Sequence, residues 1–120
     1  MFVCGSSVYA KTVKVSVMSD VHIKLTQNKQ GDYIINPSIH NLKNAVKMVN
    51  STDVNYVIFT GDCIDNSNKE SVTMFAKIIK PVNKPYYVLL GNHDVSQVTG
   101  VDKKKFFHLV NRFSHNKTKK

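Results

Sequence analysis

Three short runs rich in β-branched and aromatic residues most constrain what this chain can fold into. They lie at residues 13–18, 56–60 and 86–90, and their composition is typical of buried strands. A helical pattern with one apolar face follows each run. The resulting order, β-α-β-α-β-α, has connections long enough for crossovers and therefore predicts parallel strands in one α/β layer. Both faces of such a sheet are expected to be covered.

The predicted helices begin at residues that commonly cap helix N-termini. Asn36 precedes a proline at the first helical position, Ser67 or Asn68 can cap the second helix, and Asp102 can cap the third. The polar segment at residues 24–35 contains a glycine and is expected to form a loop over the sheet edge nearest the first strand. At 120 residues the chain is expected to form at most one domain.

Each predicted strand runs directly into a cluster of polar residues. Because the carboxyl ends of parallel strands meet at one edge of a sheet, the three clusters are expected to converge in space. Each cluster alone is equally typical of a surface turn. Turn chemistry does not require Asp, His and Asn at all three strand ends, whereas a metal site does. The clusters are Asp20-Val21-His22, Gly61-Asp62-Cys63-Ile64-Asp65 and Gly91-Asn92-His93-Asp94.

Taken together, these clusters resemble the first three motifs of the calcineurin-like metallophosphoesterase superfamily, over about residues 12–95. The resemblance implies a hydrolase acting on phosphomonoesters or phosphodiesters through a metal-activated hydroxide. It implies two divalent metal ions, with Mn, Fe or Zn favoured by the mixed nitrogen and oxygen ligands. It also implies that the parallel β-α-β-α-β layer is half of an α/β/β/α sandwich.

The resemblance further implies which residues bind the metals. One metal would be held by Asp20 and His22, and Asp62 would bridge both. The ligands implied by the family pattern are Asp20, His22, Asp62 and Asn92.

Two catalytic residues are implied as well. His93 would face the substrate, and Asp94 would fix the tautomer of its imidazole. Asp65 would act in support of these residues or close the turn after Asp62.

The family pattern continues with a further His and a Gly-His-x-His segment, for which we find no match in this sequence. The later histidines, His108 and His115, are more typical of a helix surface and a lysine-rich tail. We therefore expect the N-terminal portion of a metallophosphoesterase, weakly active or inactive as an isolated chain. An alternative is a subunit that another chain completes in trans.

The charge of the chain is concentrated near its end. Most of the net charge of +9 falls within residues 101–120, which is typical of a solvated helix face, so we predict no specific nucleic-acid partner. A non-catalytic basic binding module is the alternative. No apolar run is long enough to span a bilayer.

Residues 1–10 resemble the remnant of a signal peptide, although no basic region precedes them. Such a remnant implies export to the periplasm or the extracellular space; otherwise the chain is expected to be cytoplasmic. Residues 11–120 are then predicted to form a partial phosphoesterase domain with a basic C-terminal segment.

Overall fold

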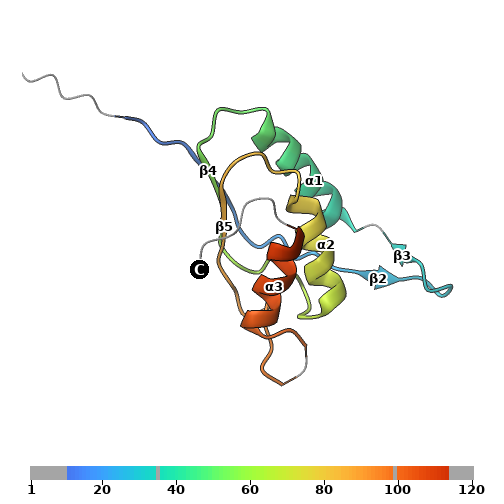
Figure 1. Ribbon diagram of the computed structural model, residues 1–120. Helices are drawn as coiled ribbons and strands as arrows, with labels where there is room; N and C mark the ends of the chain where they lie inside the picture. Colours follow the sequence, from blue (N-terminus) through green and yellow to red (C-terminus); the bar gives the residue numbers. More distant parts are fainter. Residues whose placement is uncertain (1–10, 35, 99, 114–120) are drawn as a thin grey trace, which may run out of the picture.

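The computed structural model describes residues 11–34, 36–98 and 100–113. Its main sheet has three strands in the order β1-β4-β5, and both neighbouring pairs are parallel (Figure 1). The predicted parallel α/β layer is therefore confirmed. The strands are β1 (Val15–Met18), β4 (Tyr56–Phe59) and β5 (Tyr86–Val88).

The described residues form three helices, and each begins at a predicted cap. They are α1 (Pro37–Asn50), α2 (Lys69–Ile79) and α3 (Lys103–Phe113). The side chain of Asn36 accepts a hydrogen bond from the first turn of α1, and that of Asn68 does so for α2. Asp102 accepts one from the amide of Lys105. These side chains satisfy backbone amides that lack partners inside the helices.

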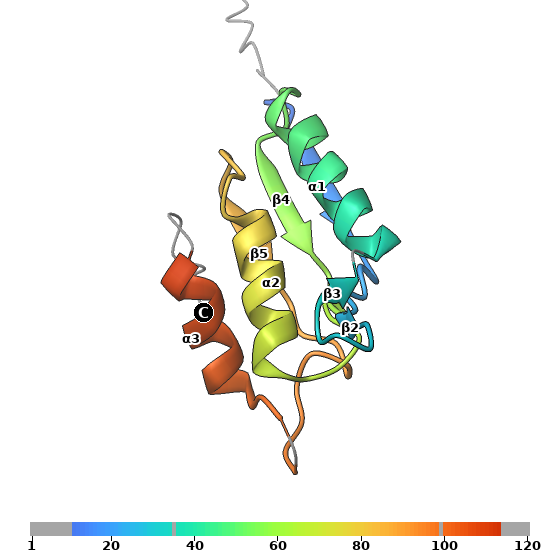
Figure 2. The same cartoon turned by 90° about the vertical axis from the view of Figure 1, so that its right-hand side faces the viewer.

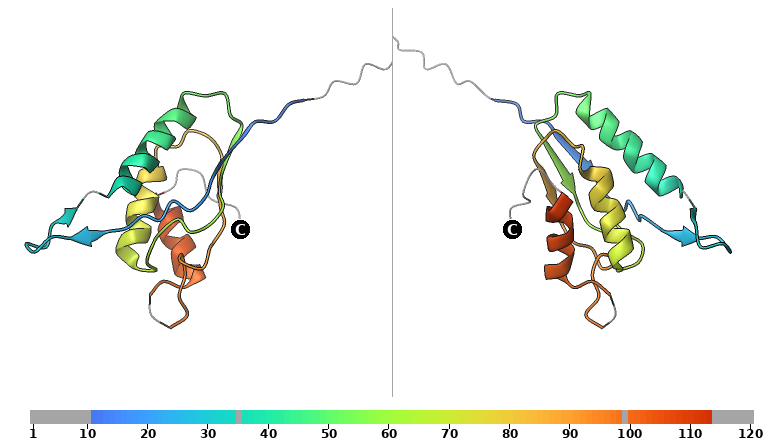
Figure 3. Two further views of the ribbon diagram at one scale, coloured as in Figure 1. Left: turned by 180° about the vertical axis from the view of Figure 1, so that it is seen from behind. Right: turned by 45° about the vertical axis from the view of Figure 1, so that its right-hand side comes forward.

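The core lies between the sheet and the helices, which are on the same side of the strands (Figures 2 and 3). Phe59 of β4 and Phe75 of α2 are fully buried. Their rings meet edge to face, with the ring centroids 5.4 Å apart. Helix α3 adds Phe106 and Val110, which are also fully buried. Helix α3, which lies within the basic C-terminal segment, is thus packed into the core.

The opposite face of the sheet is exposed, contrary to the prediction of buried strands. Val15, Val17, Tyr87 and Leu89 are large apolar residues in or directly beyond the strands, and each is more than a third exposed, Val17 at 61%. Strand residues alternate between the two faces, so helices on one side leave every second residue uncovered. Among the described residues, no element covers this face.

The segment predicted as a loop over the sheet edge is instead a short antiparallel hairpin that points away from the sheet (Figure 1). Its strands are β2 (Thr26–Gln27) and β3 (Tyr33–Ile34). The side chain of Asn28 accepts hydrogen bonds from the amides of Gln30 and Asp32. Gly31 adopts a φ of +87°, which allows the chain to turn within the hairpin.

The resemblance to a signal-peptide remnant concerns residues 1–10, which lie outside the described residues, as do residues 114–120. Among the described helices, none combines the length and the apolar character needed to cross a membrane.

We predict that Phe75→Ala lowers the free energy of unfolding by about 3–5 kcal/mol, because it removes a fully buried ring and leaves a cavity against Phe59. Urea denaturation followed by circular dichroism measures this. Met48→Ala is the matched control, since Met48 lies on α1 with most of its side chain in solvent. Equal losses in the two variants would contradict the described core.

Candidate metal centre

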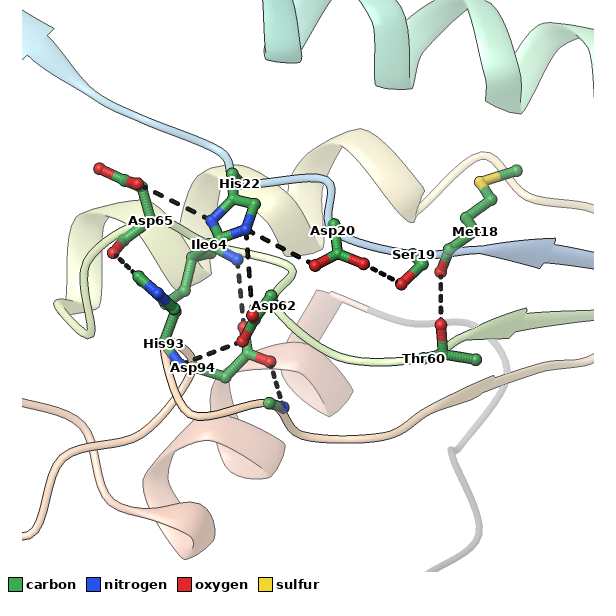
Figure 4. A network of polar contacts seen from close by, with 11 residues as sticks. Met18, Ser19, Asp20, His22, Thr60, Asp62, Ile64, Asp65, His93 and Asp94 are labelled. Carbon is green, nitrogen blue, oxygen red and sulfur yellow. Dashed lines mark hydrogen bonds and ion pairs between the residues drawn. The ribbon is translucent and has the colours of Figure 1, made fainter.

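The loops that follow β1 and β4 run side by side beyond the strands (Figure 4). The amide of His22 donates to the carbonyl of Asp62 at 2.9 Å, and that of Ile23 donates to Cys63 at 3.0 Å. The amide of Asp65 donates a hydrogen bond to the carbonyl of Ile23 at 3.0 Å. The first two polar clusters are therefore brought together as the sequence predicts, by a continuation of the parallel pairing of their strands.

The third loop is joined to the second by the carboxylate of Asp94, which is completely buried. One of its oxygens accepts from the amide of Ile64 at 3.1 Å, and the other accepts from Gly91 at 2.8 Å. Burial raises the pKa of Asp94, while these backbone hydrogen bonds oppose the rise. Asp94 therefore holds two loops together, rather than bonding to the imidazole of His93 as the sequence analysis predicted.

Glycines allow the second and third loops to approach closely. Gly61 has a φ of +104°, and a Cβ placed on it would lie 2.8 Å from the amide nitrogen of Gly91. A Cβ on Gly91 would lie 2.0 Å from Oδ1 of Asp62. The same oxygen accepts a hydrogen bond from the amide of His93 at 3.1 Å. Asp62 is thus fixed against the third loop, with Oδ2 facing Nε2 of His22 at 3.9 Å.

Three non-glycine residues of the first two loops adopt the left-handed backbone conformation. They are Asp20, His22 and Asp62, with φ of 52°, 45° and 48°. This conformation costs roughly 1–2 kcal/mol per residue for an L-amino acid, and such strain is concentrated at functional sites. All three are predicted metal ligands, so the backbone is strained at the residues that would bind the ion.

The structure places two groups of ligand atoms within 4.8 Å of one another. Asp20, His22 and Asp62 form the first group; these are three of the residues predicted as ligands, and that assignment stays a prediction. Nε2 of His22 lies 3.8 Å from Oδ1 of Asp20 and 3.9 Å from Oδ2 of Asp62. Carboxylate oxygens with an imidazole nitrogen suit divalent ions such as Mn, Fe or Zn. The residues present therefore fit a metal ion.

The second group contains His22, Asp65 and His93. Sequence reasoning did not assign Asp65 or His93 as ligands, although the Gly-Asp-x-x-Asp spacing already placed Asp65 in the same loop as Asp62. Asn92 is exposed in the third loop and lines a shallow polar hollow together with Asp65 and His93. Its assignment as a ligand stays a prediction.

The imidazole of His93 is exposed at the rim of this site, and its Nδ1 lies 2.9 Å from the backbone carbonyl of Asp65. A carbonyl oxygen only accepts, so Nδ1 carries the proton. This hydrogen bond raises the pKa of His93, and the charges of Asp62, Asp65 and Asp94 raise it further. The partner that fixes the ring is therefore Asp65 and not Asp94.

Comparison with known proteins identifies the family. Residues 13–119 match the sequence profile of the calcineurin-like phosphoesterases. The chain belongs to the calcineurin-like phosphoesterase family. This family is metal-dependent, and the convergent Asp and His side chains described above are the candidate metal ligands of this chain.

Two curated relatives are named as phosphodiesterases. The chain is 37% identical over 81 residues to a probable glycerophosphodiester phosphodiesterase of Arcobacter nitrofigilis, covering 64% of this chain and 28% of the relative. It is 26% identical over 98 residues to a probable cyclic nucleotide phosphodiesterase of Fibrobacter succinogenes, covering 82% of this chain and 37% of the relative. The chain therefore matches roughly a third of the length of each relative.

We predict that Gly91→Ala weakens Mn²⁺ binding by about 10–100-fold, because the new methyl group would displace Asp62. Isothermal titration calorimetry measures the affinity. Gly31→Ala is the control: its Cβ meets open space in the hairpin, so any effect of alanine at its φ of +87° stays away from Asp62. Unchanged affinity in Gly91→Ala would contradict the described contact.

We predict that Asp20→Gly raises the free energy of unfolding by about 1 kcal/mol in the absence of metal while weakening Mn²⁺ binding. Glycine relieves the left-handed backbone, and the substitution removes a carboxylate whose oxygen lies within 4.8 Å of an oxygen of the Asp62 carboxylate. Asp53→Gly is the control, since Asp53 is exposed and has no positive φ; it is expected to lower stability. A loss of stability in Asp20→Gly would contradict the assignment of strain.

Proposed function

We propose that this chain carries the metal-binding part of a phosphoesterase that hydrolyses phosphodiesters. The observation that carries the proposal is the convergence of Asp20, His22 and Asp62 beyond the ends of two parallel strands. The names of both relatives favour phosphodiesters over phosphomonoesters. The exposed position of Asp20, whose side chain is 66% accessible, leaves the site open to a phosphate ester.

The chain's own residues divide the chemical tasks. Divalent ions, when bound, lower the pKa of water and neutralise the charge of the phosphate. Asp20 and Asp62 supply negative charge that attracts such ions, and His22 supplies a nitrogen ligand. His93 has a raised pKa and an exposed ring, so it suits donation of a proton or hydrogen bond to a phosphate oxygen or leaving group.

Two ions are part of the proposal, with Mn, Fe or Zn as the candidates. Because His22 belongs to both groups of ligand atoms, a second ion needs other ligands. Asp62 as a bridge and Asn92 as a further ligand would supply them in part. With so few ligands for the second ion, the isolated chain is expected to have weak activity.

The alternative of a basic binding module concerns the lysines of α3. Lys103, Lys104 and Lys105 are exposed, but the apolar face of the same helix is buried in the core. Deleting residues 103–120 would therefore damage the fold, and charge-neutralising substitutions of these lysines are the better test. Binding to DNA that falls steeply with salt and is lost in Lys103→Gln/Lys104→Gln/Lys105→Gln would favour the alternative.

We predict slow, Mn²⁺-dependent hydrolysis of bis-p-nitrophenyl phosphate that a chelator abolishes. Asp62→Ala should reduce the rate by about 100-fold or more, because Asp62 is the carboxylate fixed between the second and third loops. Asp53→Ala, a distant exposed carboxylate, is the control and should retain the rate. Hydrolysis that persists in Asp62→Ala or without metal would contradict the proposal.

The same assay separates an isolated chain from a subunit completed in trans. A rate per chain that is independent of protein concentration indicates that each chain acts alone. A rate per chain that rises with protein concentration, together with Mn²⁺-dependent association on size-exclusion chromatography, indicates completion by another copy.

A further inference from the structure

We propose that the uncovered face of the main sheet is a self-association surface, at which two copies of this chain pack sheet against sheet. The helices lie on the other side of the strands (Figures 2 and 3). The inference goes beyond the proposed function, because it needs neither a metal ion nor a substrate. We call the uncovered side the open face, and it consists of Val15, Val17, Tyr56, Ile58, Tyr87 and Leu89.

The register of the strands places these residues on one side of the sheet. In the parallel pair of β1 and β4, Val15 lies beside Tyr56. The next row crosses all three strands and consists of Val17, Ile58 and Tyr87. Neighbours in register share a face of the sheet. Two adjacent rows of apolar or aromatic side chains therefore cover the open face.

The third strand extends this surface. The rings of Tyr56 and Tyr87 are neighbours, with centroids 6.3 Å apart. The amide of Leu89 donates a hydrogen bond to the carbonyl of Phe59 at 2.8 Å, which continues the pairing of β5 with β4. Leu89 therefore lies on the same side as Tyr87, two residues before it.

The residues of β1 indicate that the open face is not built for water. A sheet with one solvated face normally has polar residues at alternate strand positions on that face. In β1 the open-face positions are Val15 and Val17. The alternate residues, Ser16 and Met18, are on the side of the helices, where Met18 packs against the core. The uncovered side of β1 is therefore its entirely β-branched, apolar side.

The exposed area is large enough for a dimer. Five residues of the open face, given at the end of this paragraph, are between 38% and 61% exposed. At ordinary residue sizes these fractions leave roughly 450 Å² uncovered, which is in the range where the largest apolar patch of a protein is often functional. Two such faces in contact remove roughly 900 Å² from water, and the rim brings the total to about 1,000 Å², the lower bound for a specific interface. The five residues are Val15, Val17, Tyr56, Tyr87 and Leu89.

The chemistry of the open face favours a second copy over a charged partner. The chain has a net charge of +9, but none of the six open-face residues is Asp, Glu, Lys, Arg or His. A nucleic acid or an acidic protein finds no charge to pair with there, whereas two copies bring no like charges into the contact. A flat sheet face is complementary to another sheet face, with about 10 Å between the sheets. Every further copy offers the same face, so the contact is twofold symmetric.

A dimer of this kind responds to conditions in a distinctive way. A twofold contact occupies the open face of both copies, so association stops at the dimer. The net charge of +9 on each copy opposes association, and salt screens it, so added salt strengthens the dimer. Asp20, His22 and Asp62 are outside the open face, so Mn²⁺ leaves the association unchanged. The last property separates this dimer from completion of the metal site in trans.

The test is analytical ultracentrifugation of the 120-residue chain from about 1 to 100 µM, where we expect a monomer–dimer equilibrium. Val17→Lys places a charge at a position that is 61% exposed, so the fold is retained and the dimer is weakened by about 10-fold or more. Val98→Lys is the matched control: it makes the same change of residue and charge between β5 and α3, where Val98 is 91% exposed. This control should associate as the unmutated chain does. Circular dichroism checks that both variants are folded.

A second measurement needs no variant. In a mixture of isotope-labelled and unlabelled copies, NMR detects contacts between methyl groups of different molecules. We expect such contacts for Val15, Val17 and Leu89, and none for Val98. The same contacts should be seen with and without Mn²⁺.

Three results would overturn the proposal. The first is a chain that stays monomeric up to about 100 µM, which leaves the open face to a different polypeptide. The second is a dimer that Val17→Lys and Val98→Lys weaken equally, or contacts between copies that map to α1 or the hairpin. The third is association that requires Mn²⁺, which locates the contact at the metal ligands. Association is measured without substrate, so Mn²⁺-dependent hydrolysis judges the proposed function separately.

Discussion

The geometry of the site depends on the buried carboxylate of Asp94. Parallel pairing aligns the loops after β1 and β4, but the third loop has to be tied in separately. Asp94 does this by accepting hydrogen bonds from the amides of Ile64 and Gly91. The backbones of Gly61 and Gly91 then lie in contact. A buried charge is costly unless it is hydrogen-bonded, so the loops are held in the one arrangement that satisfies it. Asp62 and His93 take their positions from that arrangement.

The rest of the fold supports a strained and negatively charged edge. Asp20, His22 and Asp62 are in the left-handed conformation, and ligand atoms of these three residues lie within 4.8 Å of one another, with like charges on the two carboxylates. Both costs are offset by the core formed by β4, β5 and the helices. The other face of the sheet remains apolar and exposed, as expected for half of the sandwich of this family, and the chain matches roughly a third of each curated relative.

The sequence predicts the parts of this structure that depend on local patterns. Asn36, Asn68 and Asp102 cap helices because their side chains reach the nearby amides, and the polar clusters meet because parallel strands end at one edge. The position of Asp94 depends on contacts 30 residues apart that no local pattern encodes. The exposed sheet face escaped prediction for a similar reason: β4 and β5 have apolar or aromatic residues on both faces, so composition alone does not say which face the helices cover.

The convergence of three strand ends predicts a cation site around Asp62. Line broadening of backbone amide signals by paramagnetic Mn²⁺ tests for this site directly, because the effect falls steeply with distance from the ion. We expect broadening at low Mn²⁺ to be confined to residues near Asp20, Asp62 and His93, with the amides of α1 and the hairpin turn unaffected. Broadening centred on another part of the chain, or spread evenly over it, would contradict a site at these strand ends.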